Sequence, residues 1–302
     1  ENEGIVMGEV TGVGVANGSN GTGIGMPGGG DFITPPAKTQ INGASPEQGR
    51  AVPLFVAKET SRQYWRQSAY MTYTGTGWQQ TTRNRPLASG VPNAELTQND
   101  EVIDYQIELL TETRSLPTAW QPAQVNILGV SDPVPLEAST VGGISSEKSL
   151  ESGTTYAAVS NKPPDDPETL RGTSREYPRE IKSTYTQLPA ETPDRVDEFT
   201  TELTADSPTA YDTAVTVRDW LKTNKAYDLD TPINTSRPIA DQFIFEVDRG
   251  YCQHFATTMV VMLRSQGIPA RYVVGFASGS QVGEQEYLVT SGDGHAWVEV
   301  YF

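Results

Sequence analysis

The spacing of hydrophobic and polar positions changes near residue 162. Between about residues 50 and 162, short apolar or alternating runs are separated by Gly, Pro, Asn and Ser, which is typical of strands joined by turns. The run Glu101–Leu110 shows this most clearly, because apolar side chains occupy every second position from Ile103 to Leu109. We therefore predict a β-rich domain over residues 46–162.

Several aromatic side chains of this predicted domain lie close together in the sequence. They are Tyr64, Trp65, Tyr70 and Tyr73, followed by Trp78 in a Gly-Thr-Gly-Trp turn. Aromatic side chains at strand spacing usually pack in a core or between sheets, although they also form ligand-binding surfaces. We favour packing and keep a binding surface as the alternative.

Helical signals begin after the segment Lys162–Pro167, whose three prolines cannot continue either periodic structure. We predict a linker with helices over residues 163–208, and a further helix after it. The N-terminal caps and the apolar spacing indicate a short helix around Ile181 and Tyr185, a helix over Asp194–Leu203 started by Thr192 and Pro193, and a helix from a Ser207 cap to about Asn224.

The last fifty residues predict one helix followed by three strands. The helix runs from about Cys252 to Gln266, where Gly267 and Pro269 form the expected stop signal. Its apolar face contains Phe255, Met259, Met262 and Leu263. The predicted strands are Arg271–Phe276, Glu286–Thr290 and His295–Phe302.

Alternation in the last predicted strand separates its side chains into two faces. One face is apolar, and the other is mixed and includes a histidine. The apolar face contains Ala296, Val298, Val300 and Phe302, whereas the mixed face contains His295, Trp297, Glu299 and Tyr301.

Residues 1–45 are rich in glycine and have almost no large apolar side chains. Such a segment buries too little surface to offset the entropy of ordering, so we predict a flexible linker. A phosphate-binding glycine loop is the alternative, but it lacks the Lys-Ser/Thr pair that should follow.

The net charge of −16 argues against a nucleic-acid partner, because a phosphate backbone requires clustered Lys and Arg. The acidity fits either a protein from a high-salt source or an ordinary acidic secreted protein, and both alternatives stay open. The sequence contains no apolar run of 18 residues, so we expect it to contact a membrane only through segments absent from this chain. Three Asn-x-Ser/Thr triplets, at Asn17, Asn20 and Asn234, give weak support for an exported glycoprotein.

Cys252 is the only cysteine, and both histidines lie in the same segment, Arg249–Phe302. A cysteine at the start of a helix meets unpaired backbone N–H groups and the positive end of the helix dipole, which stabilise a thiolate. His295 follows 43 residues later on a separate predicted strand, as expected for a nucleophile and a base that folding brings together. The backbone N–H of Cys252 is a candidate donor to an oxyanion.

Two other interpretations of these residues involve no nucleophile. A lone cysteine on an amphipathic helix is often a small buried core residue. A metal site formed by Cys252, His254, Asp293 and His295 is disfavoured, because Cys252 and His254 point in different directions on a helix. We expect no metal and no cofactor, and we expect His254 to lie behind the site or at the surface.

Three motifs resemble the transglutaminase-like superfamily: Gly250–Ala256, Gly267–Arg271 and His295–Val300. The resemblance covers roughly residues 209–302, and Tyr64–Arg66 with Gly75–Trp78 is similar to the region upstream of the core in membrane-anchored, TgpA-type microbial members. It implies an α+β fold in which a papain-like core, a helix packed on an antiparallel sheet, follows a β-rich domain. It also implies Cys252 as the thiol nucleophile and His295 as its partner.

The family's third catalytic residue is an Asp on the strand after the histidine strand, and the sequence reaches Phe302 before such a strand. We therefore expect the core to be C-terminally incomplete here, with the Asp beyond Phe302, since Asp293 is too close to His295 in sequence to replace it well. The resemblance implies an exported ectodomain that performs cysteine-dependent acyl transfer on protein or peptide amides through a thioester. A non-catalytic binding or assembly module that retains the fold is the alternative.

Overall fold

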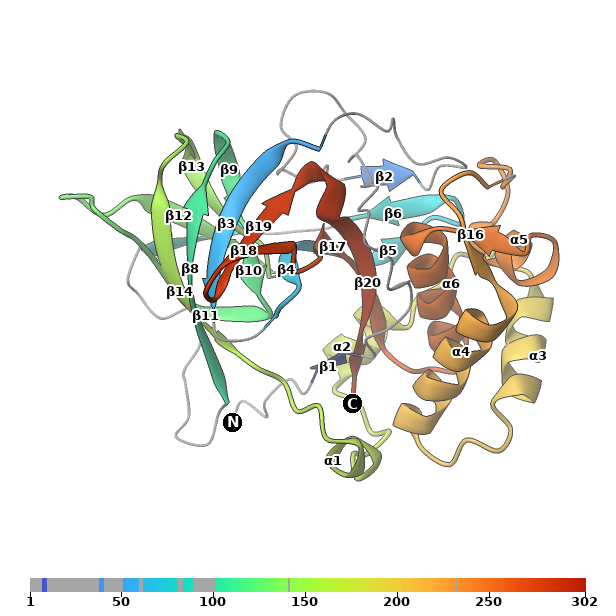
Figure 1. The fold of residues 1–302 in the computed structure, drawn as a ribbon. Coiled ribbons are helices and arrows are strands. Elements are labelled where there is room, and N and C mark those ends of the chain that lie inside the picture. The colour runs from blue at the N-terminus through green and yellow to red at the C-terminus, as the bar shows by residue number, and fades with distance from the viewer. Residues whose placement is uncertain are drawn as a thin grey trace.

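The computed structural model describes residues 7–9, 38–40, 51–59, 62–80, 84–88, 101–140, 142–231 and 233–302. Most of the predicted flexible linker, residues 1–45, therefore lies outside the described residues, as do the triplets at Asn17 and Asn20. Figure 1 shows the longer helices gathered at one end of the molecule and β-rich layers at the other, with long strands between them.

Two antiparallel sheets form the β-rich end. The first has the order β11 (Gln121–Ile127), β14 (Thr155–Asn161), β8 (Val102–Leu109), β3 (Pro53–Glu59), β19 (Glu286–Thr290) and β18 (Ser280–Gly283). The second has the order β7 (Asn84–Ala88), β12 (Pro135–Ser139), β13 (Ile144–Leu150) and β9 (Thr113–Leu116). Strand β8 alternates between exposed and buried side chains along its whole length, as its sequence predicts.

A third sheet connects this end to the helices. Its order is β1 (Met7–Glu9), β20 (Gly294–Tyr301), β17 (Ala270–Phe276), β4 (Trp65–Tyr70) and β10 (Thr118–Ala119). Two smaller sheets are β2 (Lys38–Gln40), β6 (Gly77–Gln79) and β5 (Thr72–Tyr73), and the parallel pair β15 (Ala226–Tyr227) and β16 (Arg249–Gly250). The short 3₁₀ helix η1 (Ser291–Asp293) leads into β20.

The α-helices are α1 (Pro167–Arg171), α2 (Arg179–Tyr185), α3 (Asp194–Leu203), α4 (Ala210–Asn224), α5 (Ile239–Phe245) and α6 (Cys252–Ser265). Helix α6 packs against α3, α4 and α5 as well as β17 and β20. Its residues from Cys252 to Arg264 are all buried, so this helix is central rather than amphipathic.

The predicted elements of the last hundred residues are confirmed, with small differences at their ends. Helix α6 ends one residue before Gln266, and β20 begins one residue before His295. The apolar face of β20 (Ala296, Val298, Val300 and Phe302) lies in the same core as α6, as its alternation predicts.

The start of α4 is a correction. Thr209, and not Ser207, caps this helix, because its hydroxyl accepts the backbone N–H of Asp212 at 3.1 Å. Ser207 instead forms a hydroxyl contact with Thr216 at 3.0 Å. Thr209 lies directly before the first helical residue, Ala210, so its hydroxyl reaches an N–H of the first turn, whereas Ser207 lies two residues further back.

Two sheets combine strands from both sides of the predicted boundary near residue 162. Strand β4 pairs with β17 in the central sheet, and β3 pairs with β19 in the largest sheet. Trp65, Tyr70 and Tyr73 are buried in the cores on either side, so these three aromatic rings have the packing role that we favour. Among the described helices, none is long and apolar enough to cross a bilayer.

Candidate active site

Cys252 is the first residue of α6, and the sequence before it explains how the helix begins there. Tyr251 has extended backbone angles and is the N-cap, and its N–H donates to Nδ1 of His254 at 3.2 Å. A Cβ at Gly250 would lie 2.8 Å from the Phe243 ring and 2.9 Å from Nδ1 of His254. Only glycine fits this close approach.

His254 is buried and supports the start of the helix. Its ring packs against those of Tyr251 and Phe243, with centroids 4.5 and 5.8 Å apart. The possibility that His254 lies at the surface is therefore wrong. Since its Nδ1 accepts a backbone N–H from the preceding turn, His254 holds the Gly-Tyr-Cys segment in place.

The Cys252 thiol lies inside the protein, with 1% of the residue exposed. Burial raises the pKa of Cys252 to about 12, although backbone N–H groups of Ala296 and Gln253 that donate to the sulfur act in the opposite direction. The sequence predicts a stabilised thiolate at this helix start. That prediction is wrong for this structure, because loss of water outweighs the two N–H groups.

His295 lies near the start of β20, opposite Gly275 of β17. Its ring meets the edge of Tyr64 at a centroid distance of 5.3 Å and stacks on Trp297 at 6.4 Å with an interplanar angle of 20°. Burial lowers the pKa of His295 to about 4, so the imidazole is neutral at physiological pH. Tyr64 thus has a role that packing alone does not describe, because it contacts the predicted base.

Cys252 and His295 are related through the backbone of β20. The thiol accepts the N–H of Ala296, the residue that follows His295. The structure therefore brings the Cys252 thiol of α6 to the strand that carries His295, although the His295 ring packs between Tyr64 and Trp297. The direct pairing of Cys252 with His295 stays a prediction.

Asp293 has a local structural role. Its Oδ2 accepts both the N–H and the hydroxyl of Thr290, each at 2.8 Å, and this closes the turn η1. The carboxylate is thus committed to the turn that precedes His295. Among the residues that the structure describes, no group of three or more His, Cys, Asp or Glu side chains is arranged to hold a metal ion.

A buried ion cluster lies on the same face of β20 as His295. Nε and Nη2 of Arg271 contact Oε2 of Glu299 at 2.7 and 2.6 Å, and Nε of Arg66 lies 3.7 Å from Oε1. Burial acts to raise the pKa of Glu299, but Arg271 and Arg66 outweigh it and hold that pKa below its ordinary value. The Trp297 side chain also donates to Glu299. Glu299 thereby anchors the indole on which His295 stacks.

Three tyrosines lie near Cys252: Tyr251, which belongs to the motif Gly250–Ala256, and Tyr227 and Tyr272, which the sequence did not indicate. Each has an electrostatic contact with the thiol. Tyr227 comes from β15 and Tyr272 from β17, so they reach Cys252 through strand pairing rather than sequence proximity. No local pattern could have identified them, apart from the general expectation that polar aromatic side chains line sites.

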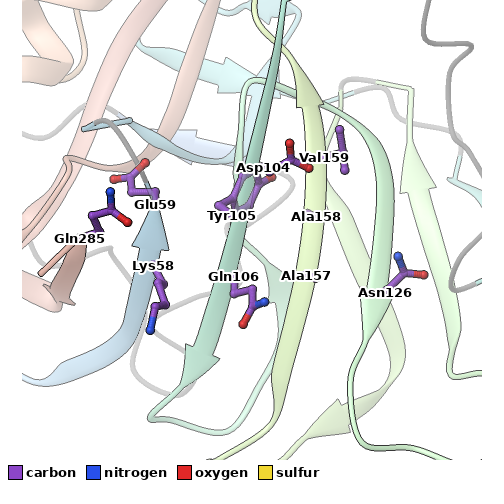
Figure 2. A pocket seen from close by; sticks show the side chains of 10 residues that line it. All are labelled: Lys58, Glu59, Asp104, Tyr105, Gln106, Asn126, Ala157, Ala158, Val159 and Gln285. Atoms are coloured by element: carbon purple, nitrogen blue, oxygen red, sulfur yellow. The ribbon is translucent and has the colours of Figure 1, made fainter.

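A cavity of about 270 Å³ lies elsewhere, on the largest sheet. Figure 2 shows it over β3, β8 and β14, with Asp104, Gln106 and Asn126 among the residues that line it. Neither Cys252 nor His295 lines this cavity, so it is separate from the candidate active site.

Comparison with known proteins agrees with this arrangement. Residues 197–302 match the transglutaminase-like superfamily, and residues 16–167 match the TgpA N-terminal domain. An uncharacterised Bacillus subtilis protein, YebA, is 31% identical over 287 residues, which are 85% of this chain and 38% of that protein. A protein-glutamine gamma-glutamyltransferase of Pseudomonas aeruginosa is 42% identical over 77 residues, 25% of this chain and 11% of that protein. The chain therefore spans less than half the length of either relative.

Solved structures support the fold. The periplasmic domain of TgpA from Pseudomonas aeruginosa has a TM-score of 0.64 and 20% sequence identity, and the match covers 83% of this chain and 84% of that one. The same domain bound to ethylmercury has a TM-score of 0.59 and 21% identity, with 83% and 86% of the two chains covered. The β-rich region followed by a helix on an antiparallel sheet is thus the α+β fold that the sequence predicts. From these matches and from the fold, the chain belongs to the transglutaminase-like superfamily, with a TgpA N-terminal domain before its core.

Proposed function

We propose that the protein catalyses cysteine-dependent acyl transfer on protein or peptide amides, with Cys252 as the nucleophile and His295 as its acid–base partner. The position of the thiol carries this proposal. Cys252 is the first residue of α6, and its sulfur accepts the N–H of Ala296, next to His295. A cysteine with only a packing role does not require a contact with the strand that carries a histidine.

The proposed reaction begins when the thiol transfers its proton to His295 and the sulfur attacks the amide carbonyl carbon. The C–N bond then breaks, a thioester remains on Cys252, and the amine leaves with the proton from His295. Water or a second amine cleaves the thioester, which gives hydrolysis or cross-linking respectively. Both outcomes share the first half of the reaction, so the proposal includes both.

In the proposed cycle, binding of the substrate changes the proton states of the site. A buried thiol whose pKa is about 12 and a half-buried imidazole whose pKa is about 4 are both neutral at pH 7. An ion pair between them requires a partner for each charge or access of water. In the proposed cycle, substrate binding or an orienting carboxylate of the kind found in the family supplies such a partner.

The test compares the full-length wild-type protein with Cys252→Ala. Incorporation of a fluorescent primary amine into a glutamine-rich protein measures transfer, and cleavage of peptide libraries measures hydrolysis. We expect both variants to fold equally well, because alanine replaces a small buried side chain, and only the wild type to be active. Equal activity of the two proteins would show that Cys252 is not the nucleophile.

The buried thiol also favours a second candidate function, a binding or assembly module that retains the fold without turnover. In that case, no acyl group attaches to Cys252 under any condition in which the protein is folded. Intact-mass measurement of the wild type and Cys252→Ala after incubation with an activated ester separates the two candidates, because only the wild type can gain an adduct on the single cysteine.

We also propose that this chain is an exported ectodomain, held at the cell surface by segments outside it. The similarity to a periplasmic domain supports this location. Fractionation of cells that express the full-length protein, with protease added outside intact cells or spheroplasts, tests this location: an exposed domain is digested without lysis.

The net charge of −16 favours a protein or peptide substrate over a nucleic acid.

A further inference from the structure

The backbone N–H of Cys252 has an unusual partner. As the first residue of α6, Cys252 has no carbonyl one turn earlier to accept its N–H. The hydroxyl of Tyr227 accepts it instead. The backbone N–H of the candidate nucleophile is thus bound by a phenol from a different element of the fold.

Backbone pairing on the preceding strand fixes this contact. β15 and β16 pair in parallel, with Tyr227 opposite Gly250. The N–H of Asp228 donates to the carbonyl of Gly250 at 2.8 Å, and the N–H of Ala226 donates to Asp248 at 2.7 Å. Tyr227 is therefore held beside the two residues that lead into Cys252.

The surroundings of the ring place Tyr227 at the border between protein and solvent. One side of the ring stacks on Phe255, with centroids 6.2 Å apart and an interplanar angle of 24°, and the residue is 40% exposed. Burial of the hydroxyl, followed by the nearby Cys252 thiol, raises the pKa of Tyr227 above its ordinary value. The phenol therefore keeps its proton and remains a hydrogen-bond donor.

We propose that Tyr227 is the second oxyanion donor of this site, acting together with the backbone N–H of Cys252. The inference rests on the acyl-transfer function proposed above. An oxygen that accepts the Cys252 N–H must lie where the Tyr227 oxygen now lies. A small rotation of the ring toward solvent admits the substrate oxygen and leaves the phenol O–H within reach of it.

The chemistry requires two donors at this point. When the Cys252 sulfur bonds to the carbonyl carbon, the π electron pair moves to the carbonyl oxygen, which becomes an oxyanion. The N–H and the phenol O–H both donate to it, and neither gives up its proton. When the intermediate collapses, the pair returns to the C–O bond, the C–N bond breaks, and the amine leaves with the proton carried by His295.

Tyr272 is the competing candidate, because its hydroxyl is fully buried and has no hydrogen-bond partner among the described residues. It also lies within electrostatic range of the thiol. However, its ring stacks on Trp78 under α6, at a centroid distance of 5.2 Å, and it is closed to solvent. A substrate carbonyl entering from outside meets Tyr227 first.

The experiment compares two reactions of the same thiol. Acylation of Cys252 by p-nitrophenyl acetate forms an oxyanion and is followed by release of p-nitrophenolate, whereas alkylation by iodoacetamide forms none. In Tyr227→Phe we expect acylation to slow by about 10²-fold while alkylation stays within about twofold of wild type. Phenylalanine keeps the stacking on Phe255, so the fold is preserved.

The matched control is Tyr272→Phe, the same substitution beside the same thiol. It removes a buried hydroxyl that has no hydrogen-bond partner among the described residues, so the protein should remain stable and acylation should fall less than in Tyr227→Phe. Equal acylation in Tyr227→Phe and wild type, or a loss in Tyr272→Phe alone, would overturn the inference. So would a parallel loss of acylation and alkylation, which indicates a general effect on the thiol. If the wild type shows no release that depends on Cys252, the proposed function itself fails.

Discussion

At the scale of single residues, Cys252 shows how position and burial oppose each other. The helix start supplies N–H groups that favour a thiolate, but the residue is 1% exposed and its pKa rises to about 12. Burial therefore holds the Cys252 thiol in a protected, protonated form. The reactivity of this thiol toward a reagent in solution then measures how accessible the sulfur is.

The first prediction concerns that protection. Iodoacetamide should alkylate native Cys252 at pH 8 at least about 10²-fold more slowly than the urea-unfolded chain, because alkylation requires an exposed thiolate. Intact mass spectrometry follows the reaction directly, since the chain has one cysteine. Native labelling as fast as unfolded labelling would show that the thiol is not enclosed.

The second prediction concerns His295. Its pKa is about 4 in the folded protein and near 6.5 in the unfolded chain, so the unfolded chain binds more protons below pH 6.5. Stability that is fully present above pH 6.5 should decrease as the pH falls toward 4, by at most about 3 kcal/mol from this residue. Urea denaturation at pH 8, 6 and 5 measures the loss.

His295→Gln is the control for this pH dependence. Glutamine keeps a polar side chain between Tyr64 and Trp297 but cannot gain a charge, so the variant should lose less stability between pH 6.5 and 4 than the wild type. The carboxylates titrate in both proteins and cancel in the comparison. Identical slopes would mean that His295 is not buried in its neutral form.

At the scale of elements, helix caps and strand registers determine where the site residues lie. Thr209 caps α4 through a bond from Asp212 N–H at 3.1 Å, and its hydroxyl donates to the Asp212 carboxylate at 2.6 Å. Helix α4 packs on α6, which begins with Cys252. The cap therefore stabilises a helix that supports α6, the helix that begins with Cys252.

The third prediction follows from this cap. Thr209→Ala should lower the free energy of unfolding by about 1 kcal/mol, because it leaves an N–H of the first turn without its partner. Thr223→Ala, on the exposed face of the same helix, should be neutral or slightly stabilising, because alanine favours helix. Chemical denaturation of both variants checks the difference. Equal effects of the two substitutions on the free energy of unfolding would indicate a change in helix propensity and not the loss of the N-cap.

Local sequence signals predicted the elements near the site but not the residues that contact them from distant parts of the chain. Gly267 and Pro269 marked the end of α6, and alternation separated Ala296 from His295 on β20, because these depend on neighbours in sequence. The contact of Tyr227 with Cys252, and that of Tyr64 with His295, depend on pairing between distant strands. The N-cap of α4 was predicted two residues too early, at Ser207, because Ser207 and Thr209 are both capping residue types and both are adjacent to Pro208. The buried state of the thiol required the packing of three other helices around α6.

At the scale of the whole molecule, the β-rich region and the core share a buried ion cluster. Arg66 comes from β4, whereas Arg271 and Glu299 come from β17 and β20. All three side chains are at least nine-tenths buried. A charge in such a place is stable only while its partners remain.

The fourth prediction uses this dependence. Glu299→Gln should destabilise the protein by about 3 to 5 kcal/mol, because it leaves the charges of Arg66 and Arg271 buried without their counter-ion. Adding Arg66→Met should then cost less than it does in the wild type, and a double-mutant cycle in urea measures this coupling. Arg218→Met, which breaks an exposed pair with Asp219, should change stability by less than about 0.5 kcal/mol. Strictly additive effects would mean that Arg66 and Glu299 do not interact.

The pairing of β4 with β17 and of β3 with β19 joins segments about 200 residues apart in the chain. Such pairing gives the fold a high contact order, so its formation should be slow compared with that of a helical protein of similar size. During synthesis, β3 and β4 must wait without their final neighbours until β17 and β19 emerge. The strand that carries His295 follows β17 and β19 in the chain, so the site is assembled only after strands from both halves of the central sheet have been made.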